Sequence, residues 1–300
     1  MATKAKSTQA KPKTAKTTRT TAAAARTTKK APVTNVTAGT PVTKQRTYTA
    51  FKNVNPSALI AEFIGTFLLV SAVAAFSGNA FFVGVALAVI VAALFNISGA
   101  HVNPAVTFGL WSMRRVTAAK MVLFWAVQFL GAMAALLVMN SFSGNGLSLS
   151  FASFWQFDWK IFSVELLGMS IFMFGIAAAA IRAQTDYDRA AGIGLSFFLG
   201  LAIATGMLSQ AAQANQTPVQ GQTAPEETRV SKVDSVALNP AVALTLSETT
   251  ATPQQPVEGE APAAPETAPS RLTVETILGA LIGAALGGNL YLLLAKHRDD

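Results

Sequence analysis

The 300-residue sequence contains no cysteine, which excludes disulfide bonds and thiolate-bound metal centres. Charged residues are scarce, at 13% of the chain, whereas 51% of the residues are hydrophobic and the mean hydropathy is +0.41. Such a hydropathy is high for a soluble globular protein. His101 has no second ligand spaced to join it in a metal site. These absences argue against a disulfide-stabilised, metal-binding or ordinary soluble protein.

Long apolar segments, nearly free of charge, are present instead. Six of them lie at about 57–77, 79–97, 117–139, 160–181, 189–208 and 273–295. Each is close to the ~20 residues that an α-helix needs to cross a bilayer. The sequence therefore predicts an all-α, integral membrane protein with six transmembrane helices.

Positive charge is concentrated at the start of the chain. Residues 1–52 contain 12 of the 23 Lys and Arg residues and none of the 15 Asp and Glu residues. By the positive-inside rule, this segment predicts a cytoplasmic N-terminus. Further basic residues follow the second, fourth and sixth spans, so we expect both termini of a multi-pass cell or plasma membrane protein to be cytoplasmic. These residues are Arg114, Arg115, Lys120, Arg182, Arg189, Lys296 and Arg298.

Residues 1–52 are predicted to be a disordered basic tail, because a segment rich in Lys, Ala, Thr and Pro cannot bury a core. Anionic lipid attracts such a segment by roughly 1 kcal/mol per cation near the surface. Nucleic acid is an alternative partner for the same composition. We favour the lipid.

The tripeptide Asn-Pro-Ala occurs twice, at 103–105 and at 239–241. Asn is a preferred helix N-cap and Pro is favoured at the first helical position. Each copy therefore predicts the start of a short helix. A single copy is a weak signal, but the surroundings are repeated as well.

Matching residues flank the two copies. Glu62 and Glu165 each open a span in the pattern Glu-x-x-Gly, and Gly131 matches Gly283. The first repeat, 57–139, and the second, 159–295, then have three spans each, so the second must be inverted in the membrane. Inverted repeats are typical of transporters and channels. Longer spacings in the second repeat predict flexible outer insertions at about 209–235 and 248–270.

On these residues the chain resembles the major intrinsic protein family, the aquaporins and glycerol facilitators. The resemblance covers about 57–295. It implies an aquaporin-like fold of six transmembrane helices plus two re-entrant half-helices, with residues 53–300 as the channel domain. It also implies a homotetramer with one pore in each subunit, and no cofactor. The stretches that carry it are Ala61–Thr66, Ser98–Thr107, Gln128–Ala132, Val164–Glu165, Asn239–Ala241 and Gly279–Tyr291.

In such a fold the two half-helices meet at the middle of the membrane, where each N-terminus focuses roughly half a positive charge. The asparagine amides would donate hydrogen bonds to a passing molecule and interrupt a proton-conducting chain of waters. The expected pore residues are Asn103, Pro104, Ala105, Asn239, Pro240 and Ala241.

Three ionisable residues fall at membrane depth, where such groups are costly and functional by default. The resemblance implies that Glu62 and Glu165 accept hydrogen bonds from the backbone of the re-entrant loops. It places His101 in the packing of the first loop. A proton-coupled transporter would need a longer titratable relay, so we favour passive transport.

The family pattern has an Arg directly after the second Asn-Pro-Ala, at a narrow outer constriction. Here that position is Val242, and the other constriction positions map to Val83, Met207 and Val236. The predicted selectivity filter is therefore apolar and has no fixed cation. An aliphatic ring would favour solutes with carbon backbones, or gate water by dewetting.

A cation from the first insertion is an alternative source of the missing charge. Arg229 or Lys232 would have to fold back toward the constriction. Replacing both with Ala would then alter selectivity.

Two functions follow from the sequence. The first is a passive channel for water or small uncharged solutes such as glycerol. The alternative is a non-conducting membrane scaffold with a degenerate pore, whose tail and outer loops bind partners. We do not expect an enzyme, because the sequence contains no visible nucleophile–base pair or metal cluster.

Overall fold

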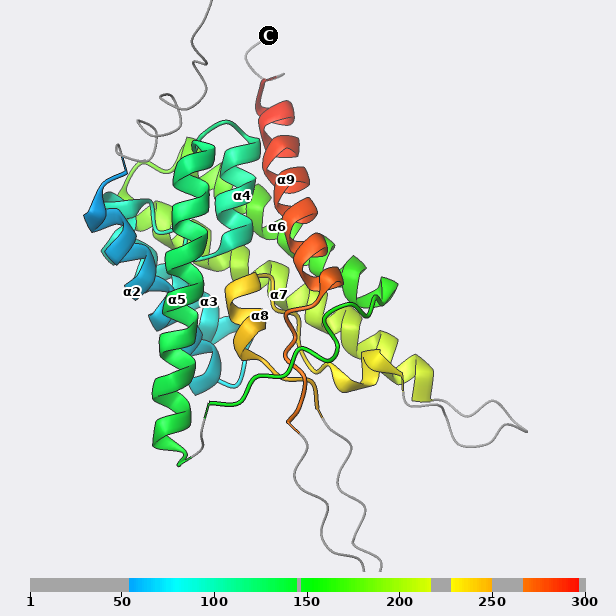
Figure 1. The fold of residues 1–300 in the computed structure, drawn as a ribbon. Coiled ribbons are helices and arrows are strands. Elements are labelled where there is room, and N and C mark those ends of the chain that lie inside the picture. Colours follow the sequence, from blue (N-terminus) through cyan, green and yellow to red (C-terminus); the bar gives the residue numbers. More distant parts are fainter. Residues whose placement is uncertain (1–53, 145–146, 217–227, 250–266, 297–300) are drawn as a thin grey trace, which may run out of the picture. The chain divides into compact units, whose positions relative to one another are not determined.

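The computed structural model describes residues 54–144, 147–216, 228–249 and 267–296 (Figure 1). The predicted tail, 1–52, lies outside these residues, as do parts of both predicted insertions. The described residues form long helices, two short helices and one 3-10 turn. The long helices are α2 (Pro56–Ala75), α3 (Ala80–Ser98), α5 (Ala118–Phe142), α6 (Trp159–Arg182), α7 (Asp186–Gln216) and α9 (Val274–Lys296), and the short elements are α4 (Pro104–Ser112), η1 (Arg229–Lys232) and α8 (Pro240–Thr245).

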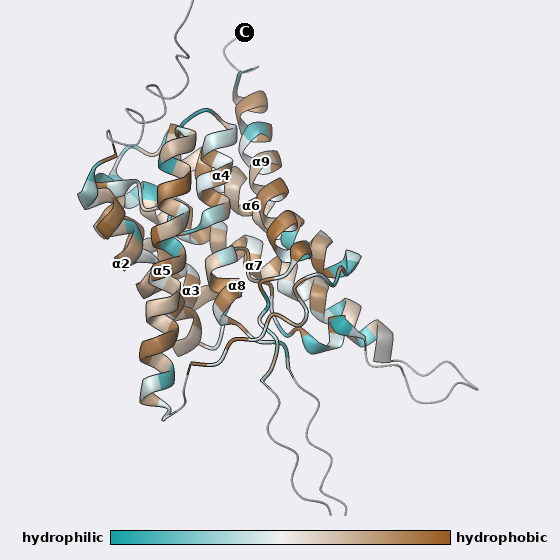
Figure 2. Ribbon diagram, viewed as in Figure 1, coloured by the Kyte–Doolittle hydropathy of each residue, from teal (hydrophilic) through white to brown (hydrophobic). Residues whose placement is uncertain are grey.

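The six long helices are each long and apolar enough to cross a membrane, with mean hydropathies of 1.9 to 2.6. Figure 2 shows predominantly hydrophobic residues along α5 and α9. Large apolar side chains on the outside of the helices are exposed, for example Ile60, Val89, Leu130 and Leu195, which are 60%, 65%, 60% and 60% exposed. Contact between such a surface and water is unfavourable, whereas lipid tails can cover it. The predicted all-α membrane fold class is confirmed.

The fifth predicted span, 189–208, is shorter than the observed helix. α7 continues to Gln216, into the first predicted insertion. Residues 209–216 are rich in Ala and Gln, which favour helix although they lower the hydropathy. Hydropathy alone therefore ended the prediction too early.

The two halves of the chain pack in the same way. α2 contacts α3 and α5, and in the second half α6 contacts α7 and α9. The halves meet through α3 and α7. Each short helix also crosses to the other half, since α4 packs against α9 and α8 packs against α5. The repeats therefore interlock.

Glycines allow close helix contact at equivalent points of the two repeats. Gly131 on α5 lies against the backbone of Phe63 on α2, and Gly283 on α9 lies against the backbone of Leu166 on α6. A Cβ atom at either glycine would overlap the facing carbonyl oxygen. Small residues at helix contacts are typical of membrane bundles, where close backbone packing replaces the hydrophobic effect.

Candidate functional site

The two Asn-Pro-Ala tripeptides begin the two short helices. Asn103 caps α4, because its Oδ1 accepts hydrogen bonds from the backbone N–H groups of Ala105 at 2.7 Å and Val106 at 3.4 Å. Asn239 caps α8 through the backbone N–H of Ala241 at 2.9 Å. The exposed fractions of Asn103 and Asn239 are only 2% and 0%. Both caps are therefore buried inside the helix bundle.

Each asparagine also binds the loop that precedes the other one. Nδ2 of Asn103 donates to the carbonyl of Leu238 at 2.9 Å, and Nδ2 of Asn239 donates to the carbonyl of Val102 at 3.0 Å. Val102 and Leu238 have φ angles of 43° and 53°, in a region that Val and Leu rarely adopt. The backbone is therefore strained at the two residues whose carbonyls join the repeats.

The reciprocal contacts leave a donor on each asparagine. A side-chain amide has two N–H groups. Among the described residues, each Nδ2 makes one hydrogen bond. One N–H of Asn103 and one of Asn239 therefore have no hydrogen-bond partner among the described residues.

Glu62 on α2 holds the first loop, which we define as residues 99–102. Its Oε1 accepts hydrogen bonds from the backbone N–H of His101 at 2.9 Å and from Ser98 Oγ at 2.7 Å. Its Oε2 accepts hydrogen bonds from the backbone N–H of Val102 at 2.7 Å and from Gln128 Nε2 at 2.8 Å. The carboxylate is fully buried, and four donors compensate for its lost hydration.

Glu165 on α6 holds the second loop, residues 235–238, in the same way. Its Oε1 accepts a hydrogen bond from the backbone N–H of Ala237 and its Oε2 from that of Leu238, each at 2.8 Å. The side-chain neighbours of the two glutamates differ. Glu62 has Ser98 and Gln128, whereas Nη2 of Arg271 lies 3.8 Å from Glu165 Oε1. Equivalent glutamates thus hold equivalent loops.

His101 packs against the start of α4 and against α5. Its Nδ1 lies 3.1 Å from Thr107 Oγ1, and its ring centroid lies 5.0 Å from that of Phe124. In the part of the chain that the structure describes, no group of three His, Cys, Asp or Glu residues could hold a metal ion.

Comparison with known proteins decides the family. A family model described as major intrinsic protein matches residues 48–217, which is more than half of the chain. The chain belongs to the major intrinsic protein family. With its six apolar helices, this major intrinsic protein is an integral, multi-pass membrane protein.

Individual relatives of this major intrinsic protein are similar over shorter stretches. A probable aquaporin TIP3-2 of Oryza sativa subsp. japonica is 52% identical over 60 residues, covering 20% of this chain and 23% of the relative. Aquaporin TIP3-1 of Zea mays is 34% identical over 132 residues, covering 42% and 49%. Aquaporin AqpM of Methanothermobacter marburgensis is 30% identical over 158 residues, covering 41% and 64%. The chain thus spans less than two thirds of the length of each of these relatives.

A solved structure is also similar. The aquaglyceroporin from Plasmodium falciparum matches with a TM-score of 0.47 and 17% sequence identity, covering 79% of this chain and 94% of that one.

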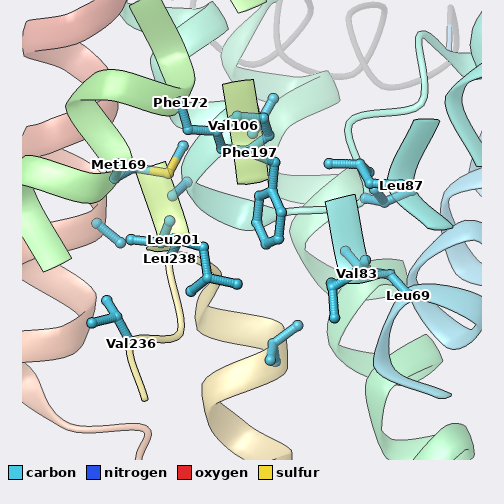
Figure 3. Packing of buried hydrophobic residues seen from close by; sticks show 14 of the residues in the cluster. Leu69, Val83, Leu87, Val106, Met169, Phe172, Phe197, Leu201, Val236 and Leu238 are labelled. Carbon is cyan, nitrogen blue, oxygen red and sulfur yellow. The ribbon is translucent and has the colours of Figure 1, made fainter. Parts of the chain in front are cut away.

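Three of the four predicted filter positions of this major intrinsic protein are buried in the bundle. Val83, Val236 and Val242 are 0%, 3% and 3% exposed and belong to one buried apolar cluster. Figure 3 shows Val83 and Val236 among the side chains of that cluster. Met207 does not join them, because it lies 46% exposed on α7.

The buried neighbour of Met207 is Leu208, which is 1% exposed and belongs to the cluster. One step along a helix turns a side chain by about 100°. The structure therefore favours Leu208 over Met207 as the residue that α7 contributes. The prediction of Met207 as a filter residue depends on where the insertion is placed in the sequence. The periodicity of buried residues along α7 indicates Leu208 instead.

Arg229, one of the two expected replacements for the missing filter cation, is bound to carboxylates. Its Nε and Nη2 donate to Glu248 Oε1 at 3.0 and 2.7 Å, and its Nη1 lies 2.5 Å from Glu275 Oε1. We call these three residues the outer ion cluster. Lys232, the other expected replacement, lies at the end of η1, where its carbonyl accepts a hydrogen bond from the backbone N–H of Thr249 at 2.8 Å.

Arg271, which was not predicted from the sequence as a site residue, lies beside Glu165. A signal was available, because Arg271 directly precedes the last apolar span on the face predicted to be outer. Cations are not favoured there by the positive-inside rule. A cation in such a place needs a local partner.

Proposed function

We propose that this chain forms a passive channel for water and small uncharged solutes such as glycerol. The observation that carries the proposal is the reciprocal pair of asparagines, each with one N–H left over. Donors from Asn103 and Asn239 can bind the oxygen of one passing molecule, whose own hydrogens then point away from both. A water held in this way cannot pass a proton along a chain of waters. The names of the relatives, which are aquaporins, support the same activity.

We propose an apolar selectivity filter formed by Val83, Val236 and Val242, with Leu208 as the contribution of α7. Aliphatic side chains offer no hydrogen bonds to a passing water, whereas they can contact the carbon atoms of a polyol. Glycerol is therefore expected to be conducted together with water.

We also propose a homotetramer with a pore in each subunit, and both termini on the cytoplasmic side of the cell membrane. The tetramer rests on the family. The orientation rests on the basic residues that follow the even-numbered spans, such as Arg114, Arg182 and Lys296.

Osmotic experiments on proteoliposomes test the proposed function. Stopped-flow light scattering should show water permeability several-fold above that of protein-free vesicles, and faster swelling in an inward glycerol gradient. Rates at the lipid background for every solute, with protein that elutes as a folded species, would overturn the proposed channel.

A non-conducting scaffold is the alternative function. The observation that favours it is the tight packing of the filter positions, which are at most 3% exposed for Val83, Val236 and Val242. The same vesicle measurement separates the two functions, because a scaffold adds nothing to the lipid background.

A further inference from the structure

Arg271 lies in the segment 267–273, which leads into α9 and runs beside the end of α8. Its backbone N–H donates to the carbonyl of Leu246 at 2.9 Å. The hydroxyl of the preceding residue, Ser270, donates to the carbonyls of Ala243 and Leu244 at 3.2 and 3.0 Å. The side chain of Arg271 is only 2% exposed. A residue from beyond the second insertion is thus fixed next to the helix that Asn239 begins.

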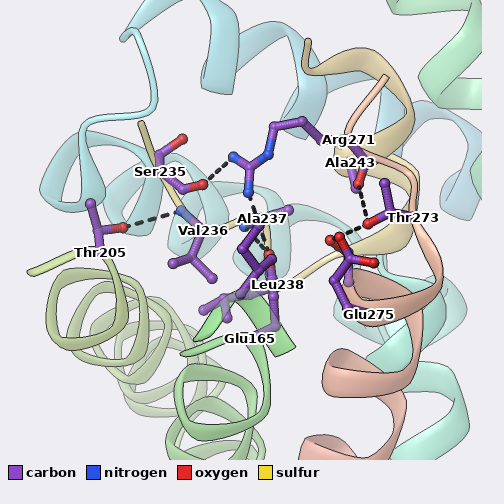
Figure 4. Close-up of polar contacts among 12 residues, drawn as sticks. Glu165, Thr205, Ser235, Val236, Ala237, Leu238, Ala243, Arg271, Thr273 and Glu275 are labelled. Atoms are coloured by element: carbon purple, nitrogen blue, oxygen red, sulfur yellow. Dashed lines mark hydrogen bonds and ion pairs between the residues drawn. The ribbon is translucent and has the colours of Figure 1, made fainter. Parts of the chain in front are cut away.

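The guanidinium of Arg271 reaches the second loop (Figure 4). Nη1 donates to the carbonyl of Ser235, the residue directly before Val236. Nη2 lies 3.8 Å from Glu165 Oε1 and makes no hydrogen bond within the described residues. The charge therefore sits beside the loop that supplies both a filter valine and the carbonyl of Leu238.

Comparison of the repeats shows that a cation replaces neutral donors in the second half. Around Glu62, the non-backbone donors are Ser98 and Gln128, which are both uncharged. Gln128 stands three residues before Gly131, and the residue three positions before Gly283 is Ala280, which has no donor. On that side the neighbouring side chain is the cation of Arg271, which lies near Glu165 without a hydrogen bond to it.

Three carboxylates attract the Arg271 guanidinium, those of Glu165, Asp234 and Glu248, and the contact with Glu165 is a long one. Both oxygens of Glu165 already accept hydrogen bonds from Ala237 and Leu238. The contact at 3.8 Å is longer than a hydrogen bond. Arg229 differs, because it is held at 2.5 to 3.0 Å by the two carboxylates of the outer ion cluster.

We propose that Arg271 is the specificity-determining cation of this channel. Its guanidinium provides, from the segment before α9, the positive charge that Val242 does not provide after the second Asn-Pro-Ala. The charge repels cations that approach the second loop, and the free Nη2 donor is available to the oxygen of a solute. This inference rests on the proposed channel function.

The size of the effect follows from the distance scale. A fixed charge within about 5–8 Å of the path, at an effective dielectric constant of about 20, changes the passage of a monovalent cation by roughly thirtyfold to three-hundredfold. Removing the charge of Arg271 also leaves the Glu165 carboxylate uncompensated, which attracts cations further. Water, which carries no net charge, is affected much less.

The test compares Arg271→Gln with the matched variant Arg229→Gln in proteoliposomes. Water permeability, proton leak and sodium leak are measured on the same preparations. Arg271→Gln should raise the proton or sodium leak at least tenfold and keep water permeability within a few-fold. Arg229→Gln removes a cation from the outer ion cluster and should leave the leak at the wild-type level. Adding Val242→Arg to Arg271→Gln should lower the leak again.

Arg271→Lys separates the effect of the charge from that of hydrogen bonding. It also tests the proposal if Arg271→Gln does not fold. A lysine keeps the charge, but its donors all sit on one compact ammonium nitrogen, so it cannot span Ser235 and a solute as the planar guanidinium does. It should exclude cations as the wild type does and change the ratio of glycerol to urea permeability. A leak equal to that of Arg271→Gln, or an unchanged solute ratio, would overturn the proposal.

The outcomes separate the role proposed for Arg271 from the proposed channel function. Wild-type protein that conducts water, combined with an Arg271→Gln variant that leaks no more than Arg229→Gln, overturns the role of Arg271 alone. Wild-type protein that conducts nothing overturns the proposed function and, with it, the role of Arg271.

Discussion

Replacing Glu62 with Leu is expected to prevent folded protein from accumulating. The substitution leaves the backbone N–H groups of His101 and Val102 without an acceptor, together with the Ser98 hydroxyl and one of the two N–H groups of Gln128 Nε2. Each buried donor left unpaired costs about 1–3 kcal/mol. Four of them remove much of the 5–15 kcal/mol that is typical of folded domains. Size-exclusion chromatography in detergent, followed by thermal unfolding, measures the loss.

Asp158→Leu is the matched control for Glu62→Leu. Asp158 is also a carboxylate, but it caps α6 in a partly exposed position by accepting hydrogen bonds from the backbone N–H groups of Lys160 and Ile161. Loss of such a cap costs about 1 kcal/mol. If Glu62→Leu unfolds no earlier than Asp158→Leu, the buried carboxylate does not hold the first loop as described.

Replacing both Asn103 and Asn239 with Ala is expected to abolish water permeation above the lipid background. The double variant loses the two donors that remain for a solute, and it also loses both helix caps and both reciprocal hydrogen bonds. Caps and hydrogen bonds are each worth about 1 kcal/mol, so the stability should fall by roughly 4 kcal/mol. The strained turns at Val102 and Leu238 then lose the contacts that hold them. Light scattering of proteoliposomes and thermal unfolding test both effects.

Asn79→Ala controls for the loss of a helix cap. Asn79 caps α3 through the backbone N–H groups of Phe81 and Phe82, at 3.2 and 3.3 Å, in an exposed position. This variant should keep the wild-type water permeability. A double variant at Asn103 and Asn239 that conducts water as Asn79→Ala does would contradict the assigned role of the asparagine pair.

Features that depend on neighbouring residues could be predicted from the sequence. The start of α4 followed from Asn103 and Pro104, because capping is a local preference. The equivalence of Glu62 and Glu165 followed from a repeated spacing. These two kinds of signal, together with the long apolar segments, were enough to predict the six spans, both short helices and the inverted repeat.

Features that depend on packing between distant segments could not be predicted in this way. The contact of Arg271 with Ser235 joins residues 36 apart, with the second insertion between them. The inward side of α7 was missed at Met207, because an insertion of uncertain position shifts the register by one residue and turns the side chain away. Where the second repeat is longer than the first, the repeated sequence pattern no longer indicates which side chains are in contact.

The reciprocal bonds between Asn103 and Leu238, and between Asn239 and Val102, have a consequence for biogenesis. While the ribosome is still making the second half, the Nδ2 amide of Asn103 and the strained Val102 carbonyl lack their partners, although Glu62 can already bind the first loop. The first half therefore acquires its last hydrogen bonds only after residue 239 has been synthesised and inserted. For the same reason, the two halves cannot diverge independently, because a change in either turn alters the fit of both.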